Sequence, residues 1–227
     1  MVKEKGERPG GIAPEMRKRM VINVLTVGMI QTNCYVVHQE DSDQCVVIDP
    51  GDEAQKIADY LKRKGLSCKG ILLTHGHFDH ITGVAELVAM TGAKTYAYEE
   101  EKDLMADPGM NGSANFSFGK EVAIEPEVLL RDKQILEIAG LRFQIIHTPG
   151  HTKGGCCFYS EEDKALFCGD TLFMESIGRT DFPTGNGRQL VDSVRNKLFV
   201  LPGDVTAYPG HGPETTIDYE QANNMFV

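Results

Sequence analysis

Thr74-His75-Gly76-His77-Phe78-Asp79-His80 is the stretch that decides how this chain is interpreted. The apolar run at residues 70–73 leads directly into it and is typical of a buried strand, so the stretch lies where a strand ends and a loop begins. A turn can direct several side chains at one point, whereas a strand alternates them between two faces. Imidazole nitrogen and carboxylate oxygen suit zinc, iron or manganese. Three of the seven histidines in 227 residues fall within these positions, which indicates a metal site.

Three further motifs lie downstream of this stretch. Each places a histidine or an aspartate at the end of an expected strand, beside a glycine or proline that turns the chain. The motifs are His147-Thr148-Pro149-Gly150-His151-Thr152, Cys168-Gly169-Asp170-Thr171 and Tyr208-Pro209-Gly210-His211-Gly212.

This order, HxHxDH followed by His, Asp and His, resembles that of the metallo-β-lactamase-fold hydrolases from about Val21 to the C-terminus. Four motifs in order are far more specific than HxHxDH alone. The segments at residues 178–183 and 208–213 are most similar to those of small glyoxalase II-like proteins. We therefore expect the α/β class, as a four-layer αββα sandwich with every ligand on loops at one edge.

The resemblance also implies two divalent metal ions, which we expect to be Zn²⁺, with Fe or Mn as alternatives. The ligands would form one group for each ion and one shared carboxylate: His75, His77 and His151; Asp79, His80 and His211; and the bridging Asp170. We expect Asp79 and Asp170 to be the catalytic carboxylates. The spacing agrees with two groups, because His75 and His77 alternate along an extended turn while Asp79 and His80 begin a helix.

The expected reaction is hydrolysis by a metal-bridging hydroxide. Two cations that share a water lower its pKa from near 16 toward neutrality. A thioester suits such a site, because its thiolate leaving group has a pKa near 8.5 and departs without an obligatory general acid. The predicted function is therefore a glyoxalase II-like thioesterase that acts on a small-molecule thioester of the hydroxyacylglutathione type.

The persulfide dioxygenases provide an alternative that stays open. They share the fold and have similar segments around His151 and residues 178–182. The resemblance implies a single iron held by the counterparts of His75, His151 and Asp170, a two-histidine-one-carboxylate set. A non-catalytic binding protein is disfavoured, because every expected ligand is present.

Three features argue against other branches of the fold or limit the resemblance. Diiron flavoproteins carry Glu at the position of His77, which disfavours oxygen reduction. The best-known β-lactamases have Cys at the position of Asp170 or no bridging acid, which disfavours antibiotic hydrolysis. Full-length glyoxalase II binds glutathione through a helical extension, whereas only 16 residues follow His211 here. The resemblance therefore implies the metal chemistry for this chain more strongly than it implies glutathione binding.

Composition restricts the class of protein further. The net charge of −10 argues against nucleic-acid binding, which requires Lys and Arg to neutralise phosphates. Residues 1–20 contain no apolar core of a signal peptide, and no run is long enough to span a membrane. We expect residues 1–20 to be a disordered tail and 21–227 to form a single domain. Six cysteines without CxxC pairing predict reduced, buried thiols and a cytoplasmic protein.

Periodicity predicts the secondary structure. Strands are expected at residues 21–25, 33–37, 45–49, 70–74, 93–98, 135–138, 141–145, 156–159, 165–168 and 205–208, the last of these being the final strand. Helices are expected around residues 57–61, ending at Gly65, around 84–88, ending near Gly92, and around 190–198. Thr215 and Thr216 predict the cap of a C-terminal helix. Residues 99–128 are expected to form a long irregular loop, either a lid or a surface excursion.

Two further residues have competing interpretations. Arg179 can form an internal ion pair with Asp181, or its planar guanidinium can hold a substrate carboxylate. His147 continues the parity of Leu141 and Phe143, so we expect a packed or supporting histidine and not a metal ligand.

Overall fold

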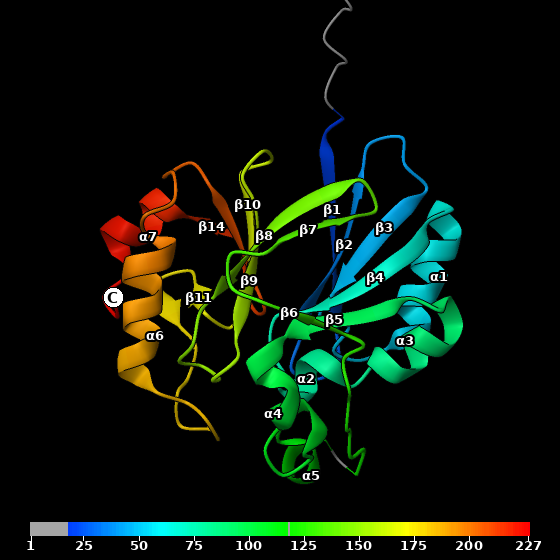
Figure 1. The fold of residues 1–227 in the computed structure, drawn as a ribbon, viewed down its shortest axis with the longest axis horizontal. Helices are drawn as coiled ribbons and strands as arrows, with labels where there is room; N and C mark the ends of the chain where they lie inside the picture. Colours follow the sequence, from blue (N-terminus) through cyan, green and yellow to red (C-terminus); the bar gives the residue numbers. More distant parts are fainter. Residues whose placement is uncertain (1–17, 118) are drawn as a thin grey trace, which may run out of the picture.

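The computed structural model describes residues 18–117 and 119–227, in which two six-stranded sheets face each other with helices outside (Figure 1). The first sheet has the order β1-β2-β3-β4-β5-β6. Its strands are β1 (Met20–Val27), β2 (Thr32–Gln39), β3 (Gln44–Ile48), β4 (Ser67–Leu73), β5 (Lys94–Tyr98) and β6 (Val128–Leu130). The first three strands are antiparallel, as expected for a meander, and β3 to β6 are parallel.

The second sheet has the order β14-β13-β10-β9-β8-β7. Its strands are β7 (Ile135–Ile138), β8 (Leu141–His147), β9 (Cys156–Ser160), β10 (Ala165–Gly169), β13 (Thr206–Pro209) and β14 (Thr215–Thr216). A separate two-stranded ribbon consists of β11 (Leu172–Phe173) and β12 (Ser176–Ile177). The parallel pair β10 and β13 sends the chain toward the same edge as the ends of β4 and β8.

Helices cover both outer faces (Figure 1). The helices α1 (Ala54–Lys64) and α3 (Val84–Thr91) lie on the first sheet. The helix α6 (Gly187–Ser193), its π-helical continuation η2 (Val194–Leu198) and α7 (Ile217–Asn223) lie on the second. The remaining helices are short: α2 (Phe78–Ile81), the 3₁₀ turn η1 (Glu99–Glu101), α4 (Lys102–Ala106) and α5 (Ser113–Phe116).

Three apolar clusters separate the four layers. Strand β4 shows the reason, because successive side chains of a strand point to opposite faces. Ile71 and Leu73 pack with the helices α1 and α3, while Leu72 packs between the sheets with Phe143 and Phe167. A third cluster joins the second sheet to α6, η2 and α7. The predicted α/β, four-layer αββα sandwich is confirmed.

Most predicted elements are present, but the short strands β6, β11, β12 and β14 were not predicted. Gly65 and Gly92 end their helices in the left-handed region, each at a φ of 67°, and Thr216 caps α7 by accepting the N–H of Tyr219 at 3.3 Å. The prediction of one irregular loop at residues 99–128 was wrong, because this region contains η1, α4 and α5. The expected final strand at residues 205–208 is also followed by β14.

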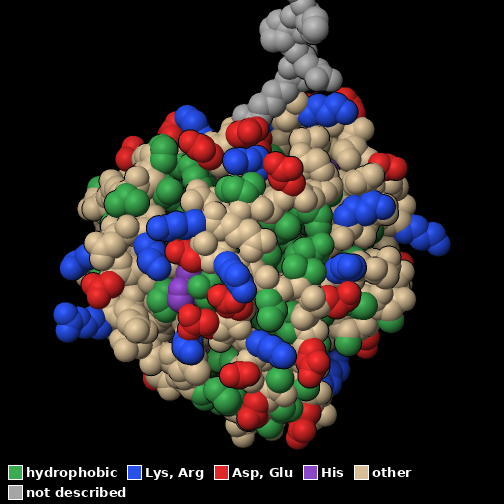
Figure 2. All heavy atoms as spheres, viewed as in Figure 1, with side chains coloured by type: hydrophobic (Ala, Val, Ile, Leu, Met, Phe, Trp, Pro, Cys, Tyr) green, Lys and Arg blue, Asp and Glu red, His purple; other side chains and the backbone are tan. Residues whose placement is uncertain are grey.

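The predicted tail at residues 1–20 lies mostly outside the described residues, and Met20 begins β1. None of the helices in residues 18–117 and 119–227 combines the length and hydrophobicity that a membrane span requires. All six cysteines are buried, free thiols, as predicted. Figure 2 shows acidic and basic side chains interspersed on one face of the molecule.

Candidate metal centre

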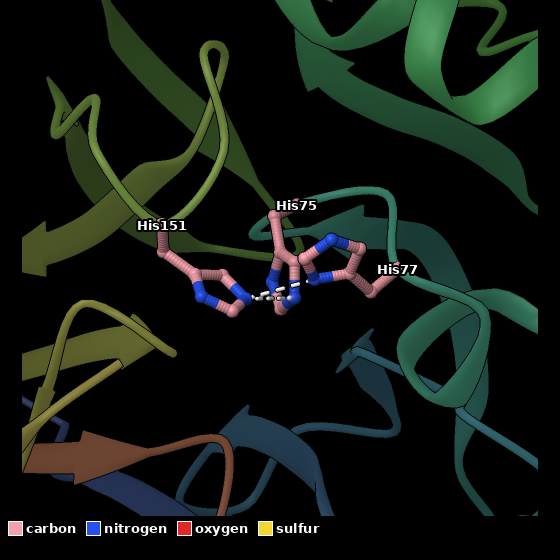
Figure 3. A group of neighbouring side chains, drawn as sticks. All are labelled: His75, His77 and His151. Atoms are coloured by element: carbon pink, nitrogen blue, oxygen red, sulfur yellow. Dashed lines mark hydrogen bonds between the residues drawn. The ribbon is translucent and has the colours of Figure 1, made fainter. Parts of the chain in front are cut away.

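Three histidines from two strand ends meet at one point (Figure 3). His75 and His77 follow β4, and His151 follows β8. The Nε2 atom of His151 lies 3.2 Å from Nε2 of His75 and 2.8 Å from Nδ1 of His77. Nitrogens about 3.3 Å apart surround a tetrahedral zinc ion whose Zn–N bonds are about 2.0–2.1 Å. The observed spacing therefore fits a single metal ion held by three imidazoles.

A second group lies beside the first. Nε2 of His211 is 3.1 Å from Oδ2 of Asp79 and 3.4 Å from Nε2 of His80. Asp79 and His80 lie in the single turn of α2, so the prediction that every ligand lies on a loop was wrong for these two residues. His211 follows β13 and approaches them from a loop, as predicted. These three side chains can hold another ion.

Asp170 lies between the two groups. Its Oδ2 is 3.6 Å from Nε2 of His151 and 3.8 Å from Nε2 of His211, while Oδ1 is 3.4 Å from Nε2 of His80. Oδ1 is buried and makes no hydrogen bond with the described residues. A buried carboxylate oxygen without a donor is costly unless a cation compensates it. This arrangement fits the predicted bridging ligand.

Burial keeps the first three histidines neutral. It lowers the pKa of His75 well below its usual value, that of His77 to about 3, and that of His151 in the same direction. A neutral imidazole has a free lone pair for a metal ion. Nδ1 of His151 donates to the carbonyl oxygen of Arg179 at 2.7 Å, which leaves Nε2 without a proton at the point where the nitrogens meet.

Carboxylates surround the second group. Burial opposes a charge on His80, but Asp79, Asp170 and Asp49 outweigh it and raise the pKa of His80 well above its usual value. Burial would likewise raise the pKa of Asp170, yet the neighbouring His80, His151 and His75 lower it well below its usual range. The site therefore holds ionised carboxylates that a cation can neutralise.

Asp49 orients both the histidine stretch and His80. Its Oδ1 accepts the backbone N–H of Thr74 at 2.8 Å, and its Oδ2 accepts the Thr74 hydroxyl at 2.6 Å. The same Oδ2 accepts Nδ1–H of His80 at 2.9 Å, which turns Nε2 of that ring toward the site. Asp49 has a φ of 49°, a left-handed conformation that costs about 1–2 kcal/mol. This strain persists because three hydrogen bonds hold the carboxylate.

Glu101 fastens two ligand loops together. Its Oε1 accepts the N–H of Gly76, between the first two histidines, and its Oε2 accepts the N–H of Gly154 beyond His151, both at 2.8 Å. The side chain is only 1% exposed. Burial raises the pKa of Glu101 to about 7, although both N–H groups act in the opposite direction. Glu101 therefore fixes the backbone beneath the first group.

The loop that carries His211 is held from the first sheet. The side-chain amide of Asn33 donates to the carbonyl oxygens of Pro209 and Gly212 at 3.1 and 2.9 Å, and Tyr35 donates to that of Pro209 at 2.6 Å. A Cβ at Gly210 would collide with Oδ1 of Asp170 and Cε1 of His80. Only glycine lets the loop pass this close to the bridging carboxylate.

The contacts of Arg179 and His147 decide part of what the sequence left open about these two residues. The guanidinium of Arg179 donates from two nitrogens to both oxygens of Asp181 at 2.7 Å, so the predicted ion pair is confirmed. It also lies over the ring of Phe182, 3.9 Å from the centroid. Binding of a substrate carboxylate by Arg179 stays a prediction. His147 stacks on Tyr98 with 4.2 Å between centroids and is in neither ligand group, as expected.

The two groups open into one cavity of about 420 Å³. Its lining combines metal-site side chains with apolar ones and one cation: Ile30, His77, Phe78, Asp79, Phe116, His151, Asp170, Phe173, Arg179, Phe182 and His211. Every predicted site residue except the buried His75 and His80 contributes to this lining. A reactant in the cavity can therefore reach both groups at once.

Sequence reasoning missed three kinds of residue at the site. Asp49 lies at the end of a strand and is followed by Pro-Gly, which is the same signal that marks the predicted ligands. A role for Asp49 at the site could therefore have been predicted. Glu101 is one of three consecutive glutamates and carries no local signal. The contacts of Phe116 and Phe182 depend on tertiary structure.

Clusters of histidine and carboxylate at one edge of an αββα sandwich can hold divalent metal ions, which are able to activate water for hydrolysis. The family model described as the metallo-beta-lactamase superfamily matches residues 27–211, and the chain belongs to that superfamily. A probable metallo-hydrolase, YqgX of Bacillus subtilis, is 39% identical over 89% of this chain and 95% of its own. Hydroxyacylglutathione hydrolase GloC of Haemophilus influenzae is 34% identical over 92% of this chain and 98% of its own.

Similar solved structures include the following three. The B3 metallo-beta-lactamase BLEG-1 has a TM-score of 0.86 and 37% identity over 91% of this chain and 99% of its own. TTHA1623, in a di-iron-bound form, has a TM-score of 0.79 and 35% identity over 90% of this chain and 100% of its own. ETHE1 of Myxococcus xanthus has a TM-score of 0.72 and 28% identity over 90% of this chain and 83% of its own.

Proposed function

We propose that this metallo-hydrolase cleaves thioesters in the manner of glyoxalase II. The observation that carries the proposal is the position of Asp170, whose two oxygens face the two ligand groups. The relative from Haemophilus influenzae named hydroxyacylglutathione hydrolase is matched over 98% of its length.

The proposed metal ligands are those predicted, with Zn²⁺ as the proposed ion: His75, His77 and His151; Asp79, His80 and His211; and Asp170 shared. When bound, two divalent ions polarise the thioester carbonyl and lower the pKa of a water molecule. The protein's part is to hold the ligand atoms in place. Asp49 fixes the ring of His80, and the carbonyl of Arg179 fixes that of His151.

The chain needs no cysteine nucleophile for this reaction. Cys168, the cysteine nearest to Asp170 in sequence, is buried with its Sγ 3.2 Å from the carbonyl oxygen of Leu172. Burial raises the pKa of this thiol well above its usual value, so it stays protonated at pH 7. The departing thiolate of a thioester is stable enough to leave without a proton from the protein.

Persulfide dioxygenation is the second candidate. It is favoured by the likeness to ETHE1 and by the convergence of His75, His151 and Asp170, which provides two imidazoles and one carboxylate. The likeness to BLEG-1 makes β-lactam hydrolysis a necessary counter-assay. The likeness to TTHA1623 in its di-iron-bound form makes iron a necessary comparison with zinc.

The test uses the purified protein loaded separately with zinc and with iron. Elemental analysis should give two ions per chain, and the zinc form should hydrolyse S-lactoylglutathione faster than a β-lactam. One iron per chain together with oxygen uptake on glutathione persulfide, and no thioester turnover, would replace the proposal with the dioxygenase.

A further inference from the structure

A second cavity continues the metal-site cavity past Asp79. It measures about 190 Å³ and has largely apolar walls, with Val27, Met29 and Ile30 among them. The two cavities have Ile30, Phe78, Asp79 and Phe116 in common. A molecule whose reacting bond lies at the metal site can therefore extend into the second cavity.

Stacked phenylalanines form one wall of this continuous cleft. The rings of Phe78 and Phe116 are 6.3 Å apart at an angle of 26°, and those of Phe116 and Phe182 are 5.6 Å apart at 19°. We call these three residues the aromatic shelf. Phe116 and Ile30 beside it are each 49% exposed. Exposed apolar groups gathered around a cleft are typical of a surface that an apolar ligand covers.

The cations of the cleft already have partners. Among the described residues, Arg179 and Lys120 are the basic side chains that line either cavity. Arg179 is held by both oxygens of Asp181, and Nζ of Lys120 lies 3.6 Å from Oδ1 of Asp52. A strongly charged ligand such as glutathione must compete with these carboxylates for the cations, whereas an apolar group on the aromatic shelf displaces no ion pair.

We propose, as an extension of the thioesterase function above, that the substrate carries an apolar, ring-sized group next to the thioester. This group lies on the aromatic shelf and enters the second cavity. The size is suitable, because an apolar cavity of about 150 Å³ in another protein holds benzene. A ring also stacks favourably on Phe116, which adds to the gain from covering apolar surface.

The ring can belong to the acyl group or to the thiol, and paired substrates distinguish the two. The acyl pair is S-phenylacetyl- and S-acetyl-N-acetylcysteamine; the thiol pair is S-benzyl and S-ethyl thioacetate. Each kcat/KM of the zinc-loaded protein is divided by the rate constant for hydroxide-catalysed hydrolysis of the same thioester. This correction removes differences in intrinsic reactivity between the thioesters. We expect the ring to raise the corrected kcat/KM by at least about tenfold in one pair.

Three variants test the location. Phe116→Ala and Ile30→Ser change exposed side chains, so folding should survive. In each variant, the ratio of the corrected kcat/KM of the ring-bearing substrate to that of its partner should fall toward one. Phe226→Ala is the matched control, because Phe226 is 57% exposed and lines neither cavity. Equal rates within both pairs, or a preference that persists in both Phe116→Ala and Ile30→Ser, would overturn the proposal.

A binding measurement separates this proposal from the thioesterase function. Calorimetry compares two stable thioethers of N-acetylcysteamine, one with a phenacyl and one with an acetonyl group. Tighter binding of the phenacyl compound that Phe116→Ala abolishes supports the ring site even if no thioester is hydrolysed, in which case only the thioesterase function fails. Equal binding and equal corrected rates within the thiol pair, together with turnover of S-lactoylglutathione, overturn the ring site and leave the thioesterase function intact.

Discussion

Oδ2 of Asp49 lies 2.9 Å from Nδ1 of His80, and this contact points the opposite nitrogen of the ring at Asp170. The carboxylate lies outside both proposed ligand groups. It determines which ring nitrogen carries the proton and how the ring is turned, and it is therefore a positioning residue for the candidate metal centre.

Asp49→Asn should weaken metal binding at the second group. An amide has one acceptor oxygen and no charge, so it cannot serve both Thr74 and His80 as the carboxylate does. We expect the affinity for the more weakly held ion to fall by about 10–100-fold. Competition with a chelating dye measures this affinity. Asp59→Asn, on the exposed face of α1, is the control, and equal affinities in both variants would contradict the role of Asp49.

Replacing Asp170 should remove metal and activity together. Asp170→Ala deletes the carboxylate that faces both groups, and Asp170→Asn keeps its shape without its charge. Loss of a supporting residue already costs about 10–100-fold in metal affinity or activity, so loss of this one should cost at least about 100-fold in kcat/KM.

Elemental analysis and circular dichroism complete the test of Asp170. Metal content should fall in both variants, and Asp170→Asn should retain the native spectrum. If Asp170→Asn keeps two ions and full activity, the carboxylate does not connect the groups.

Variants of the exposed ion pair test whether Arg179 binds substrate. Arg179→Ala should raise KM for a carboxylate-bearing thioester and leave kcat and metal content unchanged, the pattern of uniform binding. Asp181→Asn releases the guanidinium and should lower the same KM. The corresponding neutral amide thioester is the control substrate. Thermal stability should change little, because exposed ion pairs contribute little. A loss of stability with KM unchanged would assign Arg179 a structural role alone.

Glu101 should make stability depend on pH. Its pKa of about 7 in the folded protein exceeds the value near 4.5 in the unfolded chain, so between these values the folded state binds the proton more tightly. This contribution to the free energy of unfolding is complete below pH 4.5 and is lost as the pH rises to about 7. The total is about 3 kcal/mol.

Denaturant unfolding of the metal-free protein between pH 5 and pH 8 checks this dependence. The stability of the wild type relative to Glu101→Gln should decrease as the pH rises, because glutamine does not titrate. The exposed neighbour Glu100 provides the control Glu100→Gln, which should follow the wild type. A constant difference between wild type and Glu101→Gln across the range would exclude the raised pKa.

The convergence of the candidate ligands was predictable from sequence because most of them have a local signal. His75, His151, Asp170 and His211 each follow an apolar strand and adjoin a glycine or proline, so strand ends that share an edge bring them together. The four layers followed from the same patterns, since an uninterrupted apolar run such as β4 must be covered on both faces.

The remaining features depend on distant parts of the chain. Glu101 binds backbone groups 25 and 53 residues away, and no spacing in the sequence indicates such partners. The helices within residues 99–128 were missed because three to five residues are too few to establish a helical period. The stacking of Phe116 on Phe182 likewise joins two segments that are unrelated in sequence.

The aromatic shelf has a consequence for how this protein can diverge. Phe116 lies in α5 and Phe182 follows the ribbon of β11 and β12, whereas His75, His151, Asp170 and His211 directly follow core strands. Exchange of the side chains of Phe116 and Phe182 can alter which molecule is accepted, whereas the backbone before Phe182 must stay in place because the carbonyl of Arg179 orients His151. Side chains that line the cleft can therefore change while the loops that hold the candidate ligands are kept, so that relatives of this protein can share one chemistry and differ in their substrates.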